Sequence, residues 1–194
     1  MIGAALTAVG SRADDEVRRR VADPQNSFGR TFETIGGAWS TVAVAFVFAI
    51  SRSTDNRAFR EFGYDLAEGV LLNGGLTVAL KQGVRRERPD GANHAGFPSG
   101  HTSNAFVIAT LLEGHFGWKA GAPAYVFASA MAISRIQRDK HYLSDVLAGA
   151  TLGYVVGRSV VRVNGSPPDL ARVRGTVSPL IGPHIRGLSF ELTF

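Results

Sequence analysis

The chain has 194 residues, which is enough for one domain with a substantial hydrophobic core but cramped for two. It contains no cysteine, which excludes disulfides, thiolate metal ligands and a cysteine nucleophile. Charged residues make up 19% of the chain and the net charge is +5, which favours an anionic partner. Because the basic residues form no stripe interleaved with aromatic ones, we expect no nucleic-acid ligand.

Five apolar segments of helical length follow a polar stretch over residues 11–30. Glycine, proline and charged clusters separate them, as is typical of helix boundaries. They lie approximately at residues 35–51, 62–81, 102–114, 121–137 and 142–162. The pattern predicts an all-α fold, a bundle of five to six helices. Some segments are shorter than the roughly 20 residues that a membrane-spanning helix needs, so each alone fits either a short membrane span or a buried helix.

Residues 164–194 have a different character. Their four prolines exclude a continuous helix. Apolar and polar residues alternate from Leu188 to Phe194 with the period of a strand. A short C-terminal β-hairpin, formed with residues 176–182 around Gly182 and Pro183, is compatible with this pattern. We therefore divide the chain into a helical domain, 1–163, and an extended or hairpin tail, 164–194.

A cluster of cations marks the end of the second apolar segment. Residues 81–89 read KQGVRRERP, so Lys81 and Arg88 flank a polar turn and a proline follows directly. Taken alone, the cluster is also typical of a solvated helix end, because cations are stabilised near a helix C-terminus.

A second motif, FPSGH at residues 97–101, directly precedes the third apolar segment. Ser99, Gly100 and the first free N–H groups of a helix together favour an anion site. An ordinary N-cap would explain Ser99 equally well, but it would not explain the adjacent His101.

The third motif combines Ser134 and Arg135 with His141 and Asp145. The last two residues are four apart, so on a helix they would share one face. The Asp145 carboxylate would then accept the Nδ1–H of His141 and leave Nε2 free to attack. A surface His–Asp pair is the simpler interpretation if this motif is considered alone.

The order and spacing of the three motifs, KxxxxxxRP, PSGH and SRxxxxxHxxxD, resemble the signature of the type 2 phosphatidic acid phosphatase superfamily. Every fixed position is matched over residues 81–145. Residues 142–149, YLSDVLAG, also look like the bacterial membrane-phosphatase branch. The superfamily includes bacterial non-specific acid phosphatases and vanadium haloperoxidases. The resemblance implies a helical bundle with its site between the central helices.

The motifs and the resemblance together assign a role to each candidate residue. Phosphate needs dense positive charge and backbone donors, which are expected from Lys81, Arg88, Ser99, Gly100 and Arg135. His141 would attack phosphorus, and Asp145 would orient it and stabilise its cation. His101 would protonate the leaving alcohol and then activate water to cleave the phosphohistidine.

We expect no metal and no cofactor, because fixed cations would do the work of a metal. Two-metal phosphatases need clustered carboxylates. Asp14, Asp15 and Glu16 do cluster, but no histidine accompanies them, and we interpret them as solvated. Vanadate is expected as an inhibitor. Three further cations are expected to line the entrance or bind lipid headgroups: Arg85, Arg86 and Arg138.

The leading hypothesis is a metal-independent lipid phosphatase acting on phosphatidate, phosphatidylglycerol phosphate or a polyprenyl diphosphate. One alternative is a soluble periplasmic acid phosphatase of broad specificity. Another is a vanadate-dependent haloperoxidase, in which vanadate would be the cofactor, although the chain is compact for that class. A fourth is a non-catalytic bundle that docks acidic lipids, which would need neither His101 nor the His141–Asp145 pair.

The expected partners are the phosphorylated lipid substrate and membrane lipids, with no obligate protein partner. If the helices span a bilayer, the end opposite the motifs is strongly basic, through Arg52, Arg57, Arg60, Lys119, Arg158 and Arg162. Positive charge favours the cytoplasm. We therefore predict a bacterial inner-membrane protein whose site faces the periplasm or exterior.

Overall fold

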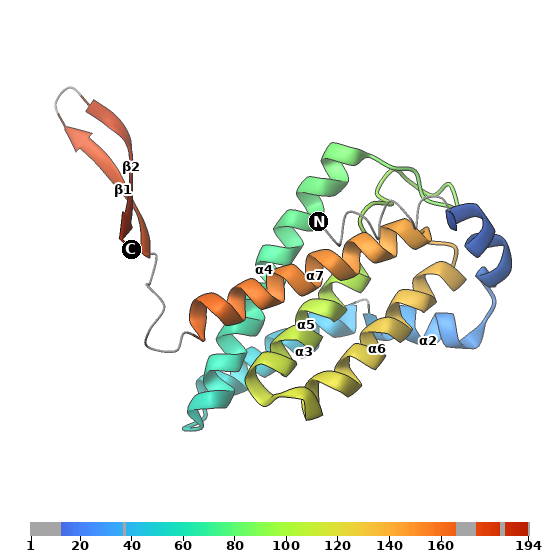
Figure 1. The fold of residues 1–194 in the computed structure, drawn as a ribbon, viewed down its shortest axis with the longest axis horizontal. Coiled ribbons are helices and arrows are strands. Elements are labelled where there is room, and N and C mark those ends of the chain that lie inside the picture. Colours follow the sequence, from blue (N-terminus) through green and yellow to red (C-terminus); the bar gives the residue numbers. More distant parts are fainter. Residues whose placement is uncertain (1–12, 37, 166–173, 183–184, 194) are drawn as a thin grey trace. The chain divides into compact units, whose positions relative to one another are not determined.

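The structure, a computed structural model, describes residues 13–36, 38–165, 174–182 and 185–193. The chain divides into two compact units, residues 1–161 and 162–194, which are described separately. The described residues form seven helices and two strands (Figure 1). The helices are residues 13–21, α2 (Ser27–Gly36), α3 (Ala38–Arg52), α4 (Arg57–Val84), α5 (Gly100–Phe116), α6 (Trp118–Gln137) and α7 (Leu143–Asn164).

The predicted all-α bundle is confirmed, with more helices than the five to six expected. Residues 13–21 form a helix within the stretch predicted as polar, 11–30, and α2 begins in that stretch and extends beyond it to Gly36. A mainly polar helix still buries a narrow apolar stripe. Val17 and Val21 supply that stripe on the first helix and pack against Ala132, Ile136 and Val146.

The main core lies where α4, α5 and α7 meet. It is formed by one pair of buried side chains from each helix: Phe62 and Leu66, Val107 and Leu111, Val156 and Val160. The helices α5 and α6 run side by side and are joined at Gly117 (Figure 1), whose φ of 76° favours glycine. This sharp connection brings the start of α5 beside the end of α6, as the sequence predicts for motifs two and three.

Glycines bring α7 almost into backbone contact with α5. Gly149, Gly153 and Gly157 are four residues apart, so they share one face of α7. A Cβ at Gly149 would lie 2.5 Å from the carbonyl oxygen of Ser99, and one at Gly153 would overlap the carbonyl oxygen of Ser103. Because no side chain separates the helices here, the position of α7 is fixed closely relative to the second motif.

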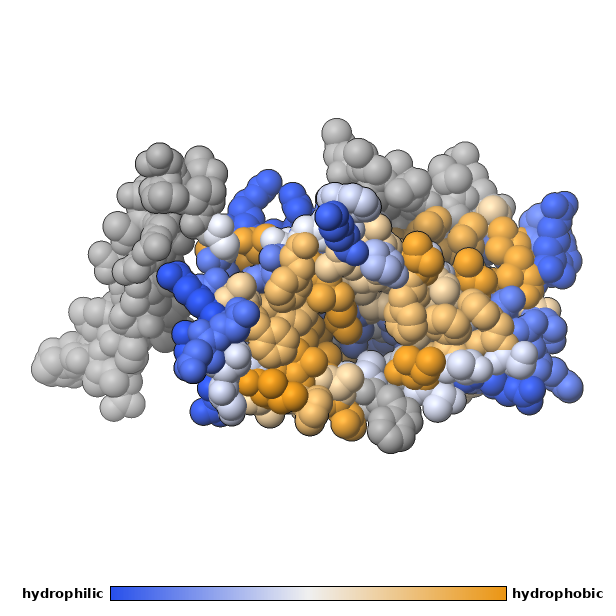
Figure 2. All heavy atoms as spheres, turned by 90° about the horizontal axis from the view of Figure 1, so that it is seen from below, coloured by the Kyte–Doolittle hydropathy of each residue, from blue (hydrophilic) through white to orange (hydrophobic). Residues whose placement is uncertain are grey.

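The surface of the helical unit is strongly apolar in places. Figure 2 shows a face whose middle is covered by hydrophobic side chains, with hydrophilic ones gathered towards its ends. Exposed large hydrophobic side chains occur on several helices, including Val42, Phe46, Leu71, Leu76, Val126 and Val155. Within the described part of the chain, α7 has the length and hydropathy needed to cross a membrane, and Val42–Arg52 forms a shorter apolar helical segment.

The second unit contains a two-stranded antiparallel hairpin. Strand β1 (Arg174–Gly182) pairs with β2 (Ile185–Thr193), so that Gly182 lies opposite Ile185 and Arg174 opposite Thr193. The predicted turn around Gly182 and Pro183 falls on residues 183–184, which lie outside the described ones.

Candidate active site

His141 is buried in the short connection between α6 and α7, with 2% of its surface exposed. Its Nδ1 lies 2.7 Å from the carbonyl oxygen of Gly96. A carbonyl can only accept, so Nδ1 carries the proton and donates it, which leaves the Nε2 lone pair free. Burial lowers the pKa of His141, so the imidazole is neutral near pH 7. The side chain therefore has the protonation state of a nucleophile.

The sequence predicts that Asp145 accepts the Nδ1–H of His141. In the structure Asp145 lies close to His141, but the Gly96 carbonyl is the nearer acceptor. Asp145 Oδ2 is 3.7 Å from His141 Nδ1 and accepts a hydrogen bond from the Tyr142 backbone N–H at 2.9 Å. The reason is that α7 begins only at Leu143, so His141 precedes the helix and Asp145 caps it from the first turn. The expected placement of both residues on one helix face is wrong.

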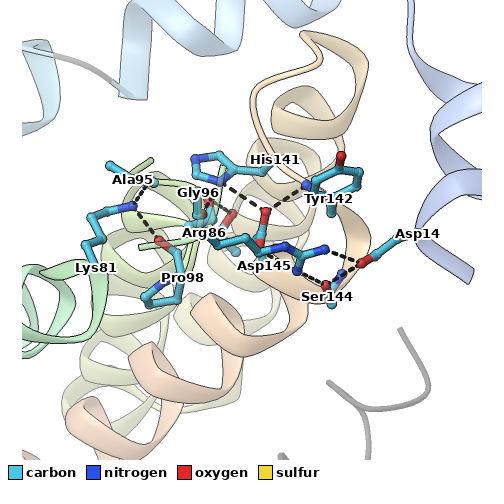
Figure 3. Close-up of polar contacts among 12 residues, drawn as sticks. Asp14, Lys81, Arg86, Ala95, Gly96, Pro98, His141, Tyr142, Ser144 and Asp145 are labelled. Carbon is cyan, nitrogen blue, oxygen red and sulfur yellow. Dashed lines mark hydrogen bonds and ion pairs between the residues drawn. The ribbon is translucent and has the colours of Figure 1, made fainter. Parts of the chain in front are cut away.

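Arg86 and Asp14 complete a buried ionic network behind Asp145 (Figure 3). Arg86 Nη1 donates to Asp145 Oδ1 at 2.9 Å, and Arg86 Nη2 donates to Asp14 Oδ2 at 2.8 Å. Asp14 is 5% exposed, so the prediction that it is solvated is wrong, although Asp15 and Glu16 are exposed as expected. Arg86, which was expected to line the entrance or bind lipid headgroups, is partly buried and paired with the Asp14 and Asp145 carboxylates.

A signal for Asp14 was present in the sequence. Asp14, Val17 and Val21 are spaced so that they share one face of a helix, and the two valines pack into the bundle. A helical interpretation of residues 13–21 would therefore have turned Asp14 inward. Nothing in the spacing indicated which cation it would meet, because Arg86 is 72 residues away.

Lys81 is held in the last turn of α4 by the loop that precedes α5. Its Nζ donates to the carbonyl oxygens of Ala95 at 2.6 Å and Pro98 at 2.7 Å (Figure 3). The same loop supplies the Gly96 carbonyl that receives the His141 proton. One short loop therefore positions both the first cation and the imidazole.

Arg88 and Arg135 carry buried donors that the described residues leave unsatisfied. The Nε of each is buried without a hydrogen-bond partner there. Arg135 is 3% exposed, and its Nη1 lies 3.5 Å from Glu33 Oε1, an ion pair that the sequence did not predict. Unsatisfied donors on buried cations are costly unless they face an anion. The two arginines are thus suited to an anionic ligand.

Ser99 and Gly100 form the start of α5. Ser99 is the N-cap, is fully buried, and makes no side-chain capping bond; its Oγ accepts from Thr102 Oγ1 at 3.0 Å. Its backbone N–H donates to the Asp145 carbonyl at 3.0 Å, which ties the second motif to the third. The free N–H groups of this helix terminus add positive potential on the same side as the cations.

His101 lies in the first turn of α5, among the cations. Burial and then the charges of Arg135 and His141 lower the pKa of His101 to about 4. Lys81 interacts electrostatically with Arg88, Asp145 and Arg135, and His141 with Lys81 and Arg135. The structure therefore brings the residues of the three motifs together at one end of the helical unit.

Of the other two cations expected at the entrance or at lipid headgroups, Arg138 shares the Glu33 carboxylate with Arg135. Arg85 is exposed just after α4. Arg138 donates through Nε to Glu33 Oε2 at 2.8 Å and also contacts the Pro24 carbonyl. In the described residues, no three histidine, cysteine, aspartate or glutamate side chains gather as a metal-binding group.

An apolar cavity of about 530 Å³ opens beside His101. Five helices, α2 to α6, supply apolar side chains to its walls, among them Val44, Val47, Leu66, Ile108 and Met131. Asn104 and Ser40 add isolated polar groups. The volume and lining are typical of a pocket for a small or medium apolar group.

Comparison with protein families places more than half of the chain in one of them. A family model described as the PAP2 superfamily matches residues 62–166. The matched range includes all three motifs and the core of α4, α5 and α7, but it leaves out residues 13–21, α2 and α3.

Two relatives match about half of the chain. A lipid A 1-phosphatase of Porphyromonas gingivalis is 43% identical over 47% of this chain and 21% of its own length. A decaprenylphosphoryl-5-phosphoribose phosphatase of Mycobacterium tuberculosis is 35% identical over 50% of this chain and 58% of its own length. The chain thus covers less than two thirds of either relative.

A solved structure has the same fold. The crystal structure of a transmembrane PAP2-type phosphatidylglycerolphosphate phosphatase from Bacillus subtilis superimposes with a TM-score of 0.65. The match covers 82% of this chain and 90% of that one, at 22% sequence identity.

Proposed function

The chain belongs to the PAP2 superfamily, and from this premise we propose that it is a metal-independent lipid phosphatase that works through a phosphohistidine on His141. The observation that carries the proposal is the hydrogen bond from His141 Nδ1 to the Gly96 carbonyl. It leaves Nε2 unprotonated beside the cations that a phosphate group requires.

In the proposed first step, Nε2 of His141 forms a bond to phosphorus as the bond from phosphorus to the ester oxygen breaks. The leaving oxygen takes the electron pair and a proton from His101. Lys81, Arg88 and Arg135 bind the phosphoryl oxygens, together with Ser99 and the Gly100 N–H. Asp145 stabilises the positive charge that develops on the His141 ring.

In the second step, His101 accepts a proton from water, and the water oxygen attacks phosphorus. The bond between phosphorus and His141 Nε2 breaks, and inorganic phosphate leaves. Burial and the nearby cations keep the pKa of His101 low. A bound phosphate dianion raises this pKa, because it favours the protonated ring, and so prepares His101 to act as the acid.

A lipid substrate is supported by the apolar cavity and by the relatives. The cavity beside His101 suits a hydrocarbon chain attached to the leaving oxygen. Both relatives described above are named as phosphatases of lipid phosphates. We propose phosphatidate, phosphatidylglycerol phosphate or a polyprenyl diphosphate as substrate, with residues 1–163 as the catalytic domain and 164–194 outside it.

We further propose that the protein resides in a bacterial inner membrane, with its site facing the periplasm or exterior. The length and hydropathy of α7 and the exposed apolar side chains of several helices support a membrane location. The basic residues at the end opposite the motifs support this orientation, since positive charge is retained in the cytoplasm.

The test measures phosphate release from a short-chain phosphatidate and from p-nitrophenyl phosphate in excess chelator, for wild type and His141→Ala. We expect turnover by wild type in chelator and loss of at least about a thousandfold in the variant, because the nucleophile is gone. Thermal unfolding in detergent checks that the variant is folded. No turnover by folded wild type, together with bromide oxidation in the presence of vanadate, would favour the haloperoxidase alternative instead.

A further inference from the structure

Asp14 is buried, and both of its carboxylate oxygens are engaged. Oδ1 accepts the Ser144 backbone N–H at 2.8 Å. Oδ2 accepts the Ser144 hydroxyl at 2.7 Å and Arg86 Nη2 at 2.8 Å (Figure 3). Its partners lie 72 and 130 residues away in the sequence. Its neighbour Asp15 is exposed on the same helix, so burial is specific to position 14.

Arg86 connects Asp14 to Asp145. Its Nη1 donates to Asp145 Oδ1 at 2.9 Å and to the Ser144 hydroxyl at 2.6 Å. Its guanidinium also lies over the Tyr142 ring, 4.4 Å from the ring centre. The stacking and the two carboxylates leave the guanidinium little freedom. Arg86 therefore holds Asp145 in one orientation, with the other carboxylate oxygen 3.7 Å from His141.

The net charge of the network formed by Asp14, Arg86 and Asp145 bears on the charge of His141. Asp14 and Asp145 are negative and Arg86 is positive, so the three together carry one negative charge. If Asp14 were neutral, Arg86 would cancel the charge of Asp145. The other charged or titratable groups around His141 and His101 include Lys81 on α4, Arg88 in the following loop, His101 on α5 and Arg135 on α6, which are cationic or neutral. The carboxylate of Glu33 on α2 is paired with Arg135 and Arg138. The net negative charge is thus what favours a positive ring on His141.

We infer that Asp14 is a positioning residue for the proposed reaction: through Arg86 it keeps the negative charge of Asp145 available to His141 as the ring becomes cationic. Asp14 touches neither the substrate nor His141. It lies outside the segment matched by the family model, on the helix of residues 13–21. The inference rests on the proposed phosphohistidine function.

The first experiment compares Asp14→Asn with Asp15→Asn in the full chain, using p-nitrophenyl phosphate. Asp14→Asn is expected to lower kcat about tenfold, the size of one lost charge-assisted interaction, with KM within about twofold. The acidic limb of kcat/KM is expected to move to lower pH, because a less negative surrounding lowers the pKa of His141. Asp15→Asn is expected to match wild type in all three quantities.

The second experiment separates charge from scaffolding. Arg86→Met alone leaves two carboxylates near His141 and is expected to move the acidic limb to higher pH. Combining it with Asp14→Asn restores one net negative charge and is expected to return the limb towards its wild-type position. If Asp14 had only a structural role, kcat would be lower in the double variant than in either single variant, and the pH shift of Arg86→Met would not be reversed.

The outcomes distinguish this inference from the proposed function. An inactive wild type overturns the proposed function. An active wild type with Asp14→Asn equal to Asp15→Asn overturns the inference alone. If Asp14→Asn does not fold, Arg86→Met still tests the charge balance, because the inference predicts that its acidic limb moves to higher pH. An acidic limb that stays in place or moves to lower pH contradicts the inference.

Discussion

His141 shows how a buried side chain can be prepared by its backbone surroundings. The Gly96 carbonyl, rather than a carboxylate, is the nearest acceptor for Nδ1, at 2.7 Å. Asp145 then acts across 3.7 Å as a nearby charge. The carbonyl fixes which nitrogen is free, and the carboxylate favours the charged ring that forms when the free nitrogen reacts. Two functions were predicted for Asp145, fixing the tautomer of His141 and stabilising its cation, and they are divided between the Gly96 carbonyl and the Asp145 carboxylate.

The pKa of His101 leads to a prediction about proton uptake when phosphate binds. A pKa of about 4 in the cationic site means that His101 is neutral near pH 6, and a bound phosphate dianion raises this pKa. We therefore expect phosphate binding at pH 6 to be accompanied by proton uptake at His101. Titration calorimetry in two buffers of different ionisation enthalpy measures the number of protons.

The matched control for this prediction is His101→Asn, which retains a polar side chain but cannot be protonated. Phosphate changes its own protonation on binding in both proteins, so the difference between them isolates His101. We expect wild type to take up a larger number of protons, by up to about one. Equal uptake in the two proteins would remove His101 from the role of general acid.

At the scale of elements, the close contact between α5 and α7 determines how well the motifs meet. We expect Gly153→Ala to force the helices apart, because its Cβ would overlap the Ser103 carbonyl oxygen. Overpacking of this kind costs about 1–3 kcal/mol in the free energy of unfolding. Activity should fall by more than stability alone explains, since α7 carries Asp145. Thermal unfolding and kcat measure the two effects.

Gly75→Ala on α4 is the matched control, because a Cβ there meets nothing within 4 Å. It is expected to leave kcat unchanged and to stabilise the protein by roughly 0.5–1 kcal/mol, the ordinary gain of alanine over glycine in a helix. If Gly153→Ala behaved like this control, the helix contact would not be setting the geometry of the site.

The sequence predicts the elements well where hydrophobic runs are long and the motifs well where their residues are close in sequence. The segments predicted for α4 to α7 differ from the observed helices mainly at their ends, and the ends are set by caps. The start of α7 was predicted at residue 142 and is observed at Leu143, so both leave His141 outside the helix; the i, i+4 spacing of His141 and Asp145 nevertheless suggested one helix face. The partners Asp14, Arg86 and Glu33 could not be paired from sequence, because long-range ion pairs have no local pattern.

For the molecule as a whole, the cavity predicts that a change in its lining affects kcat/KM for a lipid substrate more than kcat/KM for a small one. Ala105 lines the cavity and is not itself a proposed phosphate ligand, so Ala105→Phe would fill part of the apolar space. We expect kcat/KM for a short-chain phosphatidate to fall about tenfold, since each buried methylene contributes roughly 0.8 kcal/mol. The value for p-nitrophenyl phosphate should change less than about twofold.

The control is Ala122→Phe, an exposed position on α6 that does not line the cavity. It adds the same side chain to the surface and is expected to leave both substrates unaffected. A parallel loss for both substrates in Ala105→Phe would mean that the cavity does not bind the hydrocarbon chain.

The groups that surround His141 come from both ends of the helical unit, and this has a consequence for biosynthesis. Asp14 is near the start of the chain, while Ser144 and Asp145, which it holds directly and through Arg86, come 130 or more residues later. A ribosome delivers the N-terminal helix long before α7. A nascent chain that stops before residue 141 already has Lys81, Arg88, His101 and Arg135 but lacks the nucleophile. Under the proposed mechanism the protein therefore becomes a catalyst only when α7, which also completes the core, is in place.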